Sequence, residues 1–290
     1  MYSVGQDSLD VEQAITAPTR ETRTAFLAAG VAAAAALIVH AGTASAFRRR
    51  VDAMIARLGR PTSIDTTSLP LPDIVRSFAE RAVSSTATPA TVRLQQNGEM
   101  RGGPNDRWQS LTATQTIGIR EPGFVWLARI RIASFLPATV LDAYADETGL
   151  LEVRLLDSIR LARISGSNIS RGELMRYLAE LPWAPHAILH NRHLSWHELD
   201  RNTMEVSAPC VGGSARVRLL FEAGDITSIE ADDRPRAAAG RTIPTPWRGR
   251  FFDYRTIGGC RIPTRAVVGW LLDDGPFDCW RGAITNYELR

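Results

Sequence analysis

The chain has 290 residues with 34 basic and 31 acidic side chains, a formal net charge of +3 and 44% hydrophobic residues. These values exclude a disordered chain and fit one sizeable domain, or one domain with an appendage. The basic residues are mostly dispersed among acidic ones, and their one dense cluster, residues 48–50, directly follows an apolar run. We therefore expect no nucleic-acid partner.

The first 23 residues are polar, and we predict a disordered tail there. Residues 24–47 contain no acidic or basic side chain except His40. As a helix this run extends roughly 36 Å, which is long enough to cross the hydrocarbon core of a bilayer. We predict an N-terminal transmembrane helix over 24–47, which makes the protein a single-pass membrane protein.

Two alternatives to a retained anchor stay open for this segment. It ends in "ASA" at residues 44–46, which fits a signal-peptidase site, but a long acidic region precedes it. It is also rich in alanine, as a buried helix of a soluble protein is. Basic residues after the segment favour a cytoplasmic C-terminal part, whereas the cleavage-like site favours export, so the side of the membrane stays open.

Residues 48–87 are predicted to form a helical linker. The stretch 48–58 continues the preceding helix, with Val51, Met54, Ile55 and Leu58 on one face. A second short helix is predicted over 72–83, and Pro72 stands at its start.

From residue 88 to residue 290 apolar residues recur at every second position, which indicates strands. Ten to twelve strands joined by short turns predict a large antiparallel, meandering sheet. One helix interrupts them in "SRGELMRYLAELPW", where Ser170 and Glu173 have the spacing of a capping box and Leu174, Leu178 and Leu181 form the apolar stripe. The fold class is therefore α+β, mostly antiparallel β, with one or two helices packed on the sheet.

Four of the five histidines, His186, His190, His193 and His197, lie within twelve residues. On one continuous helix they would share a face and resemble a metal site. Asn191 and the alternating "LSWHELD" instead divide them among a helix end, a loop and a strand. We predict no metal site, and an acid–base role for one histidine stays open.

Cofactor and catalytic motifs are missing from the sequence. It contains no GxGxxG, P-loop, GxSxG or HExxH motif, and its three cysteines have no metal-ligand spacing. A bridge between Cys260 and Cys279 and free thiols at both positions are the two alternatives. We expect no cofactor and assign no catalytic residue.

Aromatic residues beside prolines and charges are the better candidates for a binding site. Trp183 lies in "LPWAP" and Trp247 in "PTPWRGR". Tryptophans placed in this way close a hydrophobic cavity or pack in the core. On the interrupting helix, Glu173, Arg176, Tyr177 and Glu180 share a polar face, which either meets a ligand or is solvated with internal ion pairs.

Several motifs in order, "RWQSLTATQTIGIREPGFVWLARIRI", "GELMRYLAELPWAP", "PTPWRGRFFDYR", "RIPTRAVVGW" and "CWRG", resemble an uncharacterised bacterial family, domain of unknown function 6544 (formerly 6920). The resemblance covers about residues 72–288. It implies an N-terminal membrane segment followed by basic residues, which agrees with residues 24–50. The family has no established reaction, so the resemblance assigns no catalytic residue.

A long antiparallel sheet with a helix across it is also similar by shape to the lipoprotein-carrier fold, a curved half-barrel whose concave face binds acyl chains. By this analogy we expect a membrane-anchored protein that binds a lipid or another apolar molecule in the concavity. The expected ligand-binding residues are Phe124, Trp126, Ile130, Glu173, Tyr177, Trp183, Trp247 and Arg250.

Two other functions stay open. A hydrolase-type enzyme would use Glu173, Glu180, His190 or Asp253 as acid or base, and would need them to converge in a pocket. An interaction or scaffold protein would have a filled sheet interior and an exposed apolar patch.

Overall fold

The computed structural model describes residues 20–60, 69–84, 89–132, 135–238 and 240–290, with side chains from residue 32 onward. Most of the predicted polar tail, residues 1–19, lies outside the described residues, as do the side chains of residues 24–31 in the predicted membrane segment. The chain divides into two compact units, Met1–Gly42 and Thr43–Arg290.

Helix α1 (Arg20–Leu58) begins in the first unit and ends in the second. The helical state of residues 24–47 agrees with the prediction. In the first unit, Leu37, Ile38 and Val39 are exposed. Within the described part of the chain, no helix combines the length and the apolar character that a membrane crossing requires.

The last turns of α1, within the second unit, pack against one face of the sheet. Phe47 and Val51 are buried against Val125, Leu141 and Leu150. Two of the arginines that the sequence suggested as a membrane flank bind carboxylates of the sheet here: Arg48 pairs with Asp157 at 3.0 Å, and Arg50 with Glu152 at 2.7 Å. Burial alone would raise the pKa of Glu152, but hydrogen bonds from Arg154 and Arg50 hold it below its usual value.

The second unit is built on one antiparallel sheet. Its strands, in chain order, are β1 (Thr91–Met100), β2 (Gln109–Gly118), β3 (Phe124–Ile132), β4 (Leu136–Ala145), β5 (Thr148–Leu155), β6 (Ile159–Ser165), β7 (Ser195–Asp200), β8 (Thr203–Cys210), β9 (Gly213–Glu222), β10 (Asp225–Ala238), β11 (Arg241–Ile257), β12 (Cys260–Leu272) and β13 (Gly275–Leu289).

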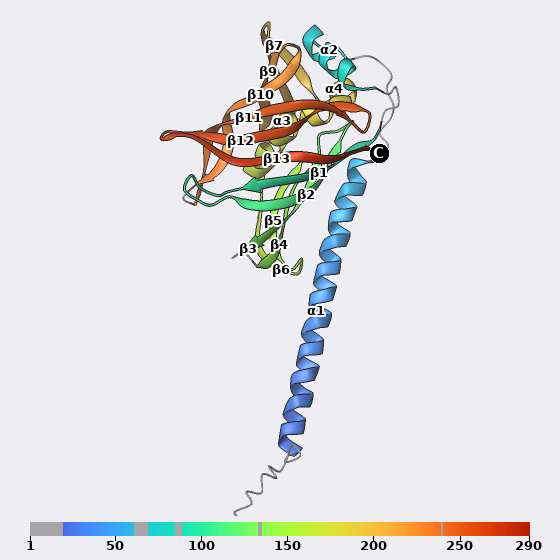
Figure 1. Cartoon of the computed structure of the whole chain (residues 1–290), viewed down its shortest axis with the longest axis vertical. Helices are drawn as coiled ribbons and strands as arrows, with labels where there is room; N and C mark the ends of the chain where they lie inside the picture. Colours follow the sequence, from blue (N-terminus) through green and yellow to red (C-terminus); the bar gives the residue numbers. More distant parts are fainter. Residues whose placement is uncertain (1–19, 61–68, 85–88, 133–134, 239) are drawn as a thin grey trace, which may run out of the picture. The chain divides into compact units, whose positions relative to one another are not determined.

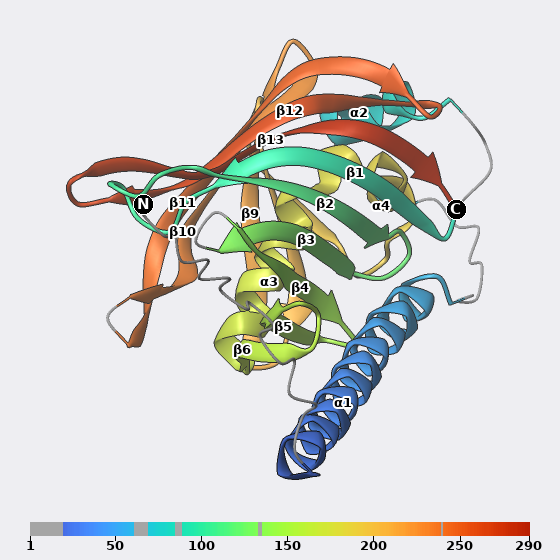
Figure 2. The ribbon, with the colours of Figure 1, turned by 60° about the horizontal axis from the view of Figure 1, so that its bottom comes forward.

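The spatial order is β6-β5-β4-β3-β2-β1-β13-β12-β11-β10-β9-β8-β7. Each half, β1–β6 and β7–β13, is a meander of neighbouring strands, and the pairing of β1 with β13 joins the two halves. The end strands β6 and β7 do not pair with each other, so the sheet is curved but not closed (Figures 1 and 2). This confirms the predicted mostly antiparallel α+β class.

Helix α3 (Ser167–Ala179) connects the two meanders and lies beneath the arch of the sheet (Figure 2). It contacts β4, β5 and β6 of the first meander and β8, β9 and β10 of the second. A short 3-10 turn, η1 (Leu181–Trp183), and helix α4 (Pro185–His190) follow it, and α2 (Asp73–Ala82) packs on α4. The strand pattern explains this arrangement, because alternate residues such as Phe124, Trp126 and Ala128 face the same core as α3.

The described residues form 13 strands rather than ten to twelve, because "GLLEVRLLDSIRLARI" folds back on itself. Leu156 and Asp157 have positive φ values of 52° and 61° and form the turn between β5 and β6. Aspartate tolerates the left-handed region but leucine rarely adopts it, so this turn has no strong signal in the sequence.

The predicted capping box is wrong. Helix α3 begins at Ser167, three residues earlier, after Gly166 with a φ of 123°. Ser170 is therefore inside the helix, and its Oγ accepts a hydrogen bond from the backbone N–H of Gly149 at 2.9 Å. Glu173 therefore does not cap the helix, and its side chain is buried at the inner face of the sheet.

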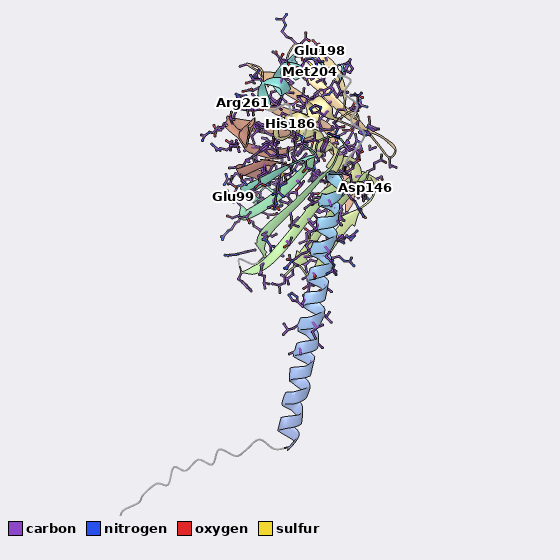
Figure 3. The ribbon with its side chains drawn as sticks, turned by 90° about the vertical axis from the view of Figure 1, so that its right-hand side faces the viewer. Glu99, Asp146, His186, Glu198, Met204 and Arg261 are labelled. Carbon is purple, nitrogen blue, oxygen red and sulfur yellow. The ribbon has the colours of Figure 1, made fainter. Side chains whose placement is uncertain are left out.

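The histidines are divided among a helix, a loop and a strand, but the prediction that His190 lies in the loop is wrong, because α4 continues to that residue. His186 and His190 belong to α4, His193 follows it, and His197 lies on β7. His186 is buried within the second unit, whereas Glu198 on β7 lies at its margin (Figure 3). In the described part of the chain, no His, Cys, Asp and Glu side chains gather in a metal-binding group.

Helix α3 approaches β5 most closely at Gly149. A Cβ at this position would lie 2.7 Å from Ser170 Cα and from the carbonyl carbon of Ile169, both backbone atoms that cannot rotate away. A Cβ at Gly172, on α3, would meet Pro235 Cδ at 3.8 Å and the carbonyl oxygen of Pro235 at 3.9 Å, which are ordinary contacts.

We expect Gly149→Ala to lower the free energy of unfolding by about 1–3 kcal/mol, because α3 must move off the sheet. Gly172→Ala is the matched control and should leave stability unchanged or raise it by up to about 1 kcal/mol through helix propensity. Urea denaturation measures both. Equal effects of the two substitutions would show that the contact at Gly149 does not limit the position of α3.

Candidate functional site

A cavity of about 310 Å³ lies between the inner face of the sheet and the segment α3–η1. Five strands from the middle of the sheet (β1 and β10–β13), the turn after β1 and three further strands of the first meander (β3–β5) contribute to it. Its lining residues are Gln96, Met100, Arg101, Gly102, Trp126, Val140, Asp142, Leu151, Arg176, Ala179, Glu180, Trp183, Ile229, Arg234, Trp247, Phe251, Val268, Trp270, Phe277, Cys279 and Trp280.

Tryptophans dominate the wall. Five of the seven in the chain line the cavity: Trp126, Trp183, Trp247, Trp270 and Trp280. Trp183, at the end of η1, is fixed by edge-to-face contacts with Phe251 at 5.7 Å and Trp280 at 6.3 Å, and its Nε1 donates to the carbonyl of Pro263. Rings held in this way form a rigid apolar surface.

A chain of hydrogen bonds runs along one side of the cavity. Trp126 Nε1 donates to Gln96 Oε1 at 2.8 Å, and Gln96 Nε2 donates to Gln115 Oε1 at 3.0 Å. Gln115 then donates to a carboxylate oxygen of Glu180. The chain joins β3, β1, β2 and the end of α3, and it satisfies each buried amide in turn.

Arg176 of α3 is the centre of this polar side. Its Nε donates to Glu180 Oε1 at 2.8 Å and its Nη1 to Asp142 on β4. The guanidinium also lies over the rings of Phe124, at 4.7 Å, and Trp126, at 5.0 Å. Burial alone would lower the pKa of Arg176, but Glu180 and Asp142 raise it above its usual value, so the side chain keeps its charge.

Glu173 is buried one turn before Arg176. Burial and the adjacent charge of Asp142 raise the pKa of Glu173 to about 8, against opposing effects of Arg234 and Arg176. One oxygen of each carboxyl group, Glu173 Oε2 and Asp142 Oδ1, is buried without a hydrogen-bond partner among the described residues. With its pKa at about 8, Glu173 holds a proton at neutral pH, and its carboxyl group is then a potential hydrogen-bond donor next to Asp142.

The structure brings three of the predicted ligand-binding residues, Trp126, Trp183 and Trp247, to the cavity wall. Glu173 and Phe124 lie directly behind the wall, where they contact Arg234 and Arg176 respectively.

The other three predicted residues lie away from the cavity wall. Tyr177 is buried in the core, where its hydroxyl donates to the carbonyl of Gly118 and accepts from Asn191 Nδ2. Ile130 packs against the edge of the core. Arg250 is partly exposed and pairs with Asp278 at 3.2 Å.

The hydrolase hypothesis required four groups to converge. Glu180 lines the cavity and Glu173 lies next to it, together with Asp142. Asp253 lies on β11 and pairs with Arg265, and His190 lies at the end of α4. Both carboxylates that line the cavity, Asp142 and Glu180, are hydrogen-bonded to Arg176, which makes the cluster an ion-pair network rather than an assembled acid–base pair.

The expected ligand-binding residues did not include several residues of the site. They are Gln96, Asp142, Arg234, Trp270 and Trp280. The polar ones occupy inward positions in strands whose other inward residues are apolar, for example Asp142 between Val140 and Tyr144. A polar residue in the apolar phase of a strand is the signal that would have identified them.

All three cysteines are free thiols, which decides between the two alternatives for Cys260 and Cys279. Cys279 lines the cavity, and burial raises the pKa of its thiol. Cys260 is fully buried, with Sγ 3.8 Å from His186 Nδ1. Protonated thiols are poor nucleophiles, so neither residue has the features of a catalytic cysteine.

Protonation of the Glu173 carboxylate makes the free energy of unfolding depend on pH. The raised pKa means that the folded protein keeps this proton between about pH 4.5 and about pH 8, where the unfolded chain has lost it, so stability falls as pH rises through this window. We expect Glu173→Gln, which is neutral at every pH, to flatten this part of the pH dependence. Urea-denaturation midpoints at a series of pH values measure it, with the exposed Glu198→Gln as control. Parallel curves for wild type and Glu173→Gln would contradict the prediction.

The solved structures that match this chain have low similarity to it. A LolA superfamily protein from Nitrosomonas europaea is 14% identical, with a TM-score of 0.38, over 74% of this chain and 93% of that chain. A DUF1329 family protein from Desulfovibrio piger is 12% identical, with a TM-score of 0.41, over 75% and 90%. A beta-barrel-like protein of domain of unknown function DUF1849 from Brucella abortus is 7% identical, with a TM-score of 0.23, over 71% and 100%.

No curated protein matches the sequence significantly. A family model does match, over residues 63–282, which is most of the chain and agrees with the span on which the resemblance was recognised. The chain belongs to the Family of unknown function (DUF6544).

Proposed function

We propose that this protein binds a lipid or another apolar molecule in the cavity beneath the curved sheet. The observation that carries the proposal is the tryptophan-lined cavity of about 310 Å³, which lies within the size range of ligand pockets. Trp126, Trp183 and Trp247, together with Trp270 and Trp280, give it an apolar wall.

The energetics of the wall support this proposal. Apolar surface that a ligand covers contributes roughly 25 cal/mol per Å² of buried area. The polar groups on one side of the cavity already have hydrogen-bond partners within the protein. Arg176 binds Asp142 and Glu180. Gln96 donates to Gln115, and Gln115 donates to Glu180. An apolar molecule therefore enters without leaving those groups unpaired.

We further propose that residues 24–47 anchor the protein to a membrane. Support comes from the length of this run and from its lack of acidic and basic side chains. An anchor would keep a lipid-binding cavity close to its source of ligand.

Filling the cavity tests ligand binding. Val268 on β12 lines it, and Val268→Phe adds a ring to the wall. We expect the affinity for N-phenylnaphthylamine, measured by energy transfer from the tryptophans, to fall about tenfold or more, which corresponds to a loss of about 1.4 kcal/mol. Val211→Phe, at an exposed turn, is the control with the same chemical change. Absence of probe binding by the wild type, or equal binding by both variants, would refute an apolar site here.

Membrane anchoring has a separate test. We expect the full chain, expressed in bacteria, to stay in the membrane fraction after extraction with alkaline carbonate, because an inserted apolar helix resists extraction whereas a peripheral protein does not. A chain in which Ala35 and Leu37 are both replaced by Lys should be released. Release of the wild type by carbonate would contradict the anchor and would leave the cavity proposal standing.

A further inference from the structure

One cation in the cavity wall has no close counter-ion. Arg234 lies on β10 and lines the cavity, with 13% of its side chain exposed. Its Nε donates to the carbonyl of Gly172 at 3.3 Å. The nearest carboxylate oxygen in the described part of the chain is Glu173 Oε1, 3.8 Å from Nη2, which is beyond hydrogen-bond distance.

The acidic residues that are near Arg234 in sequence or in space interact with other side chains. The two that precede it in sequence form a bulge against β11, where Asp232 pairs with Arg218 and Asp233 with Arg171. Glu173 has Asp142 as its other neighbour, and its raised pKa means that Glu173 carries no charge at neutral pH. The guanidinium of Arg234 is therefore a cation of the wall without a hydrogen-bonded carboxylate partner among the described residues.

A second arginine of the wall is in the same situation. Arg101 lines the cavity at the turn after β1, and its hydrogen bonds within the described residues go to two backbone carbonyls, those of Asp278 and Pro104. It also lies over the rings of Trp108 and Phe277. The two carboxylates of the wall, Asp142 and Glu180, both bind Arg176, so neither neutralises Arg101.

Three of the five tryptophan rings in the wall are already covered by the protein's own cations. Arg234 lies 4.3 Å above the ring of Trp247 and 5.5 Å from that of Trp270, and Arg176 covers Trp126. A ligand with a positive charge would meet these guanidinium groups at close range. An anion would instead meet free N–H donors of Arg234, which bind carboxylate and phosphate groups in a fixed geometry.

We propose that the cavity selects an amphipathic molecule with an anionic head group, a carboxylate or a phosphate, whose oxygens bind the guanidinium of Arg234 while its apolar tail lies against the tryptophans. This inference rests on the proposed function of the cavity and specifies its ligand class. Arg101, the second wall arginine without a carboxylate partner, adds positive potential to the same space.

The test compares four ligands of equal chain length and different heads: dodecanoate, dodecyl phosphate, dodecanol and dodecyltrimethylammonium. Binding to the full chain at neutral pH, below the micelle concentration, is measured by displacement of N-phenylnaphthylamine. We expect the two anions to bind about tenfold or more tightly than dodecanol, as one charge-assisted pair in a dry site allows, and the cation to bind more weakly than dodecanol. The two anionic arms distinguish a carboxylate head from a phosphate head.

Arg234→Gln removes the charge but keeps much of the side-chain volume. We expect it to abolish the preference for anions over dodecanol, and Arg234→Lys to retain part of it, because a lysine keeps the charge without the planar fork. Arg265→Gln, at an exposed position on β12, is the control and should keep the full preference. Far-UV circular dichroism confirms that each variant is folded.

The outcomes separate the two proposals. If dodecanol and the anions bind equally well to the wild type, or if Arg234→Gln keeps the preference, the head-group assignment is wrong and the apolar cavity stands. If none of the ligands and no apolar probe binds, the proposed function fails, and the head-group assignment with it.

Discussion

The hydrogen-bonded ion pairs of Arg176 join helix α3 to the inner face of the sheet, and the second unit depends on this contact. One side chain of α3 binds Glu180 on its own segment and Asp142 on β4, and it covers two aromatic rings of β3. Removing one partner of such a buried set costs about 3–5 kcal/mol, because the remaining charges lose their compensation. The position of α3 under the sheet, and with it the cavity, depends on this arrangement.

The concave side of a curved sheet with an open edge is usually filled by the sheet's own side chains. Here α3 keeps the inner faces of the two meanders apart, since it contacts three strands of each. Gly149 and Ser170 fix its height above β5 on one side, while Pro235 and Arg234 of β10 meet it at Gly172 on the other. The cavity is the space that α3 leaves in the middle of the sheet, where tryptophans from five different elements surround it.

Local sequence patterns were sufficient to predict the helices and strands and part of the cavity wall. The period of two predicted the antiparallel sheet, the proline-flanked Trp183 and Trp247 do line the cavity, and Asn191 did mark the end of a helix. What the sequence did not reveal depends on pairing between distant strands. Gln96 meets Gln115 and Trp126 only because β1, β2 and β3 have one particular register, and Arg234 reaches the cavity only because a bulge at Asp232 and Asp233 shifts the strand. The start of α3 was misplaced for the opposite reason, since Ser170 and Glu173 satisfy a local rule that tertiary contacts override.

The pairing of β1 with β13 has a consequence for the order in which the protein folds. Val92 lies opposite Leu289, so the strand at the middle of the sheet receives one of its two neighbours from almost two hundred residues further along the chain. During synthesis the meander β1–β6 is complete long before β13 leaves the ribosome, and one whole edge of β1 stays without a partner in the meantime. Long-range pairing of this kind is slow, and an unpaired edge is a template for the strands of other chains. The nascent protein therefore depends on protection at β1, rather than at the permanent end strands β6 and β7, until its last strand arrives.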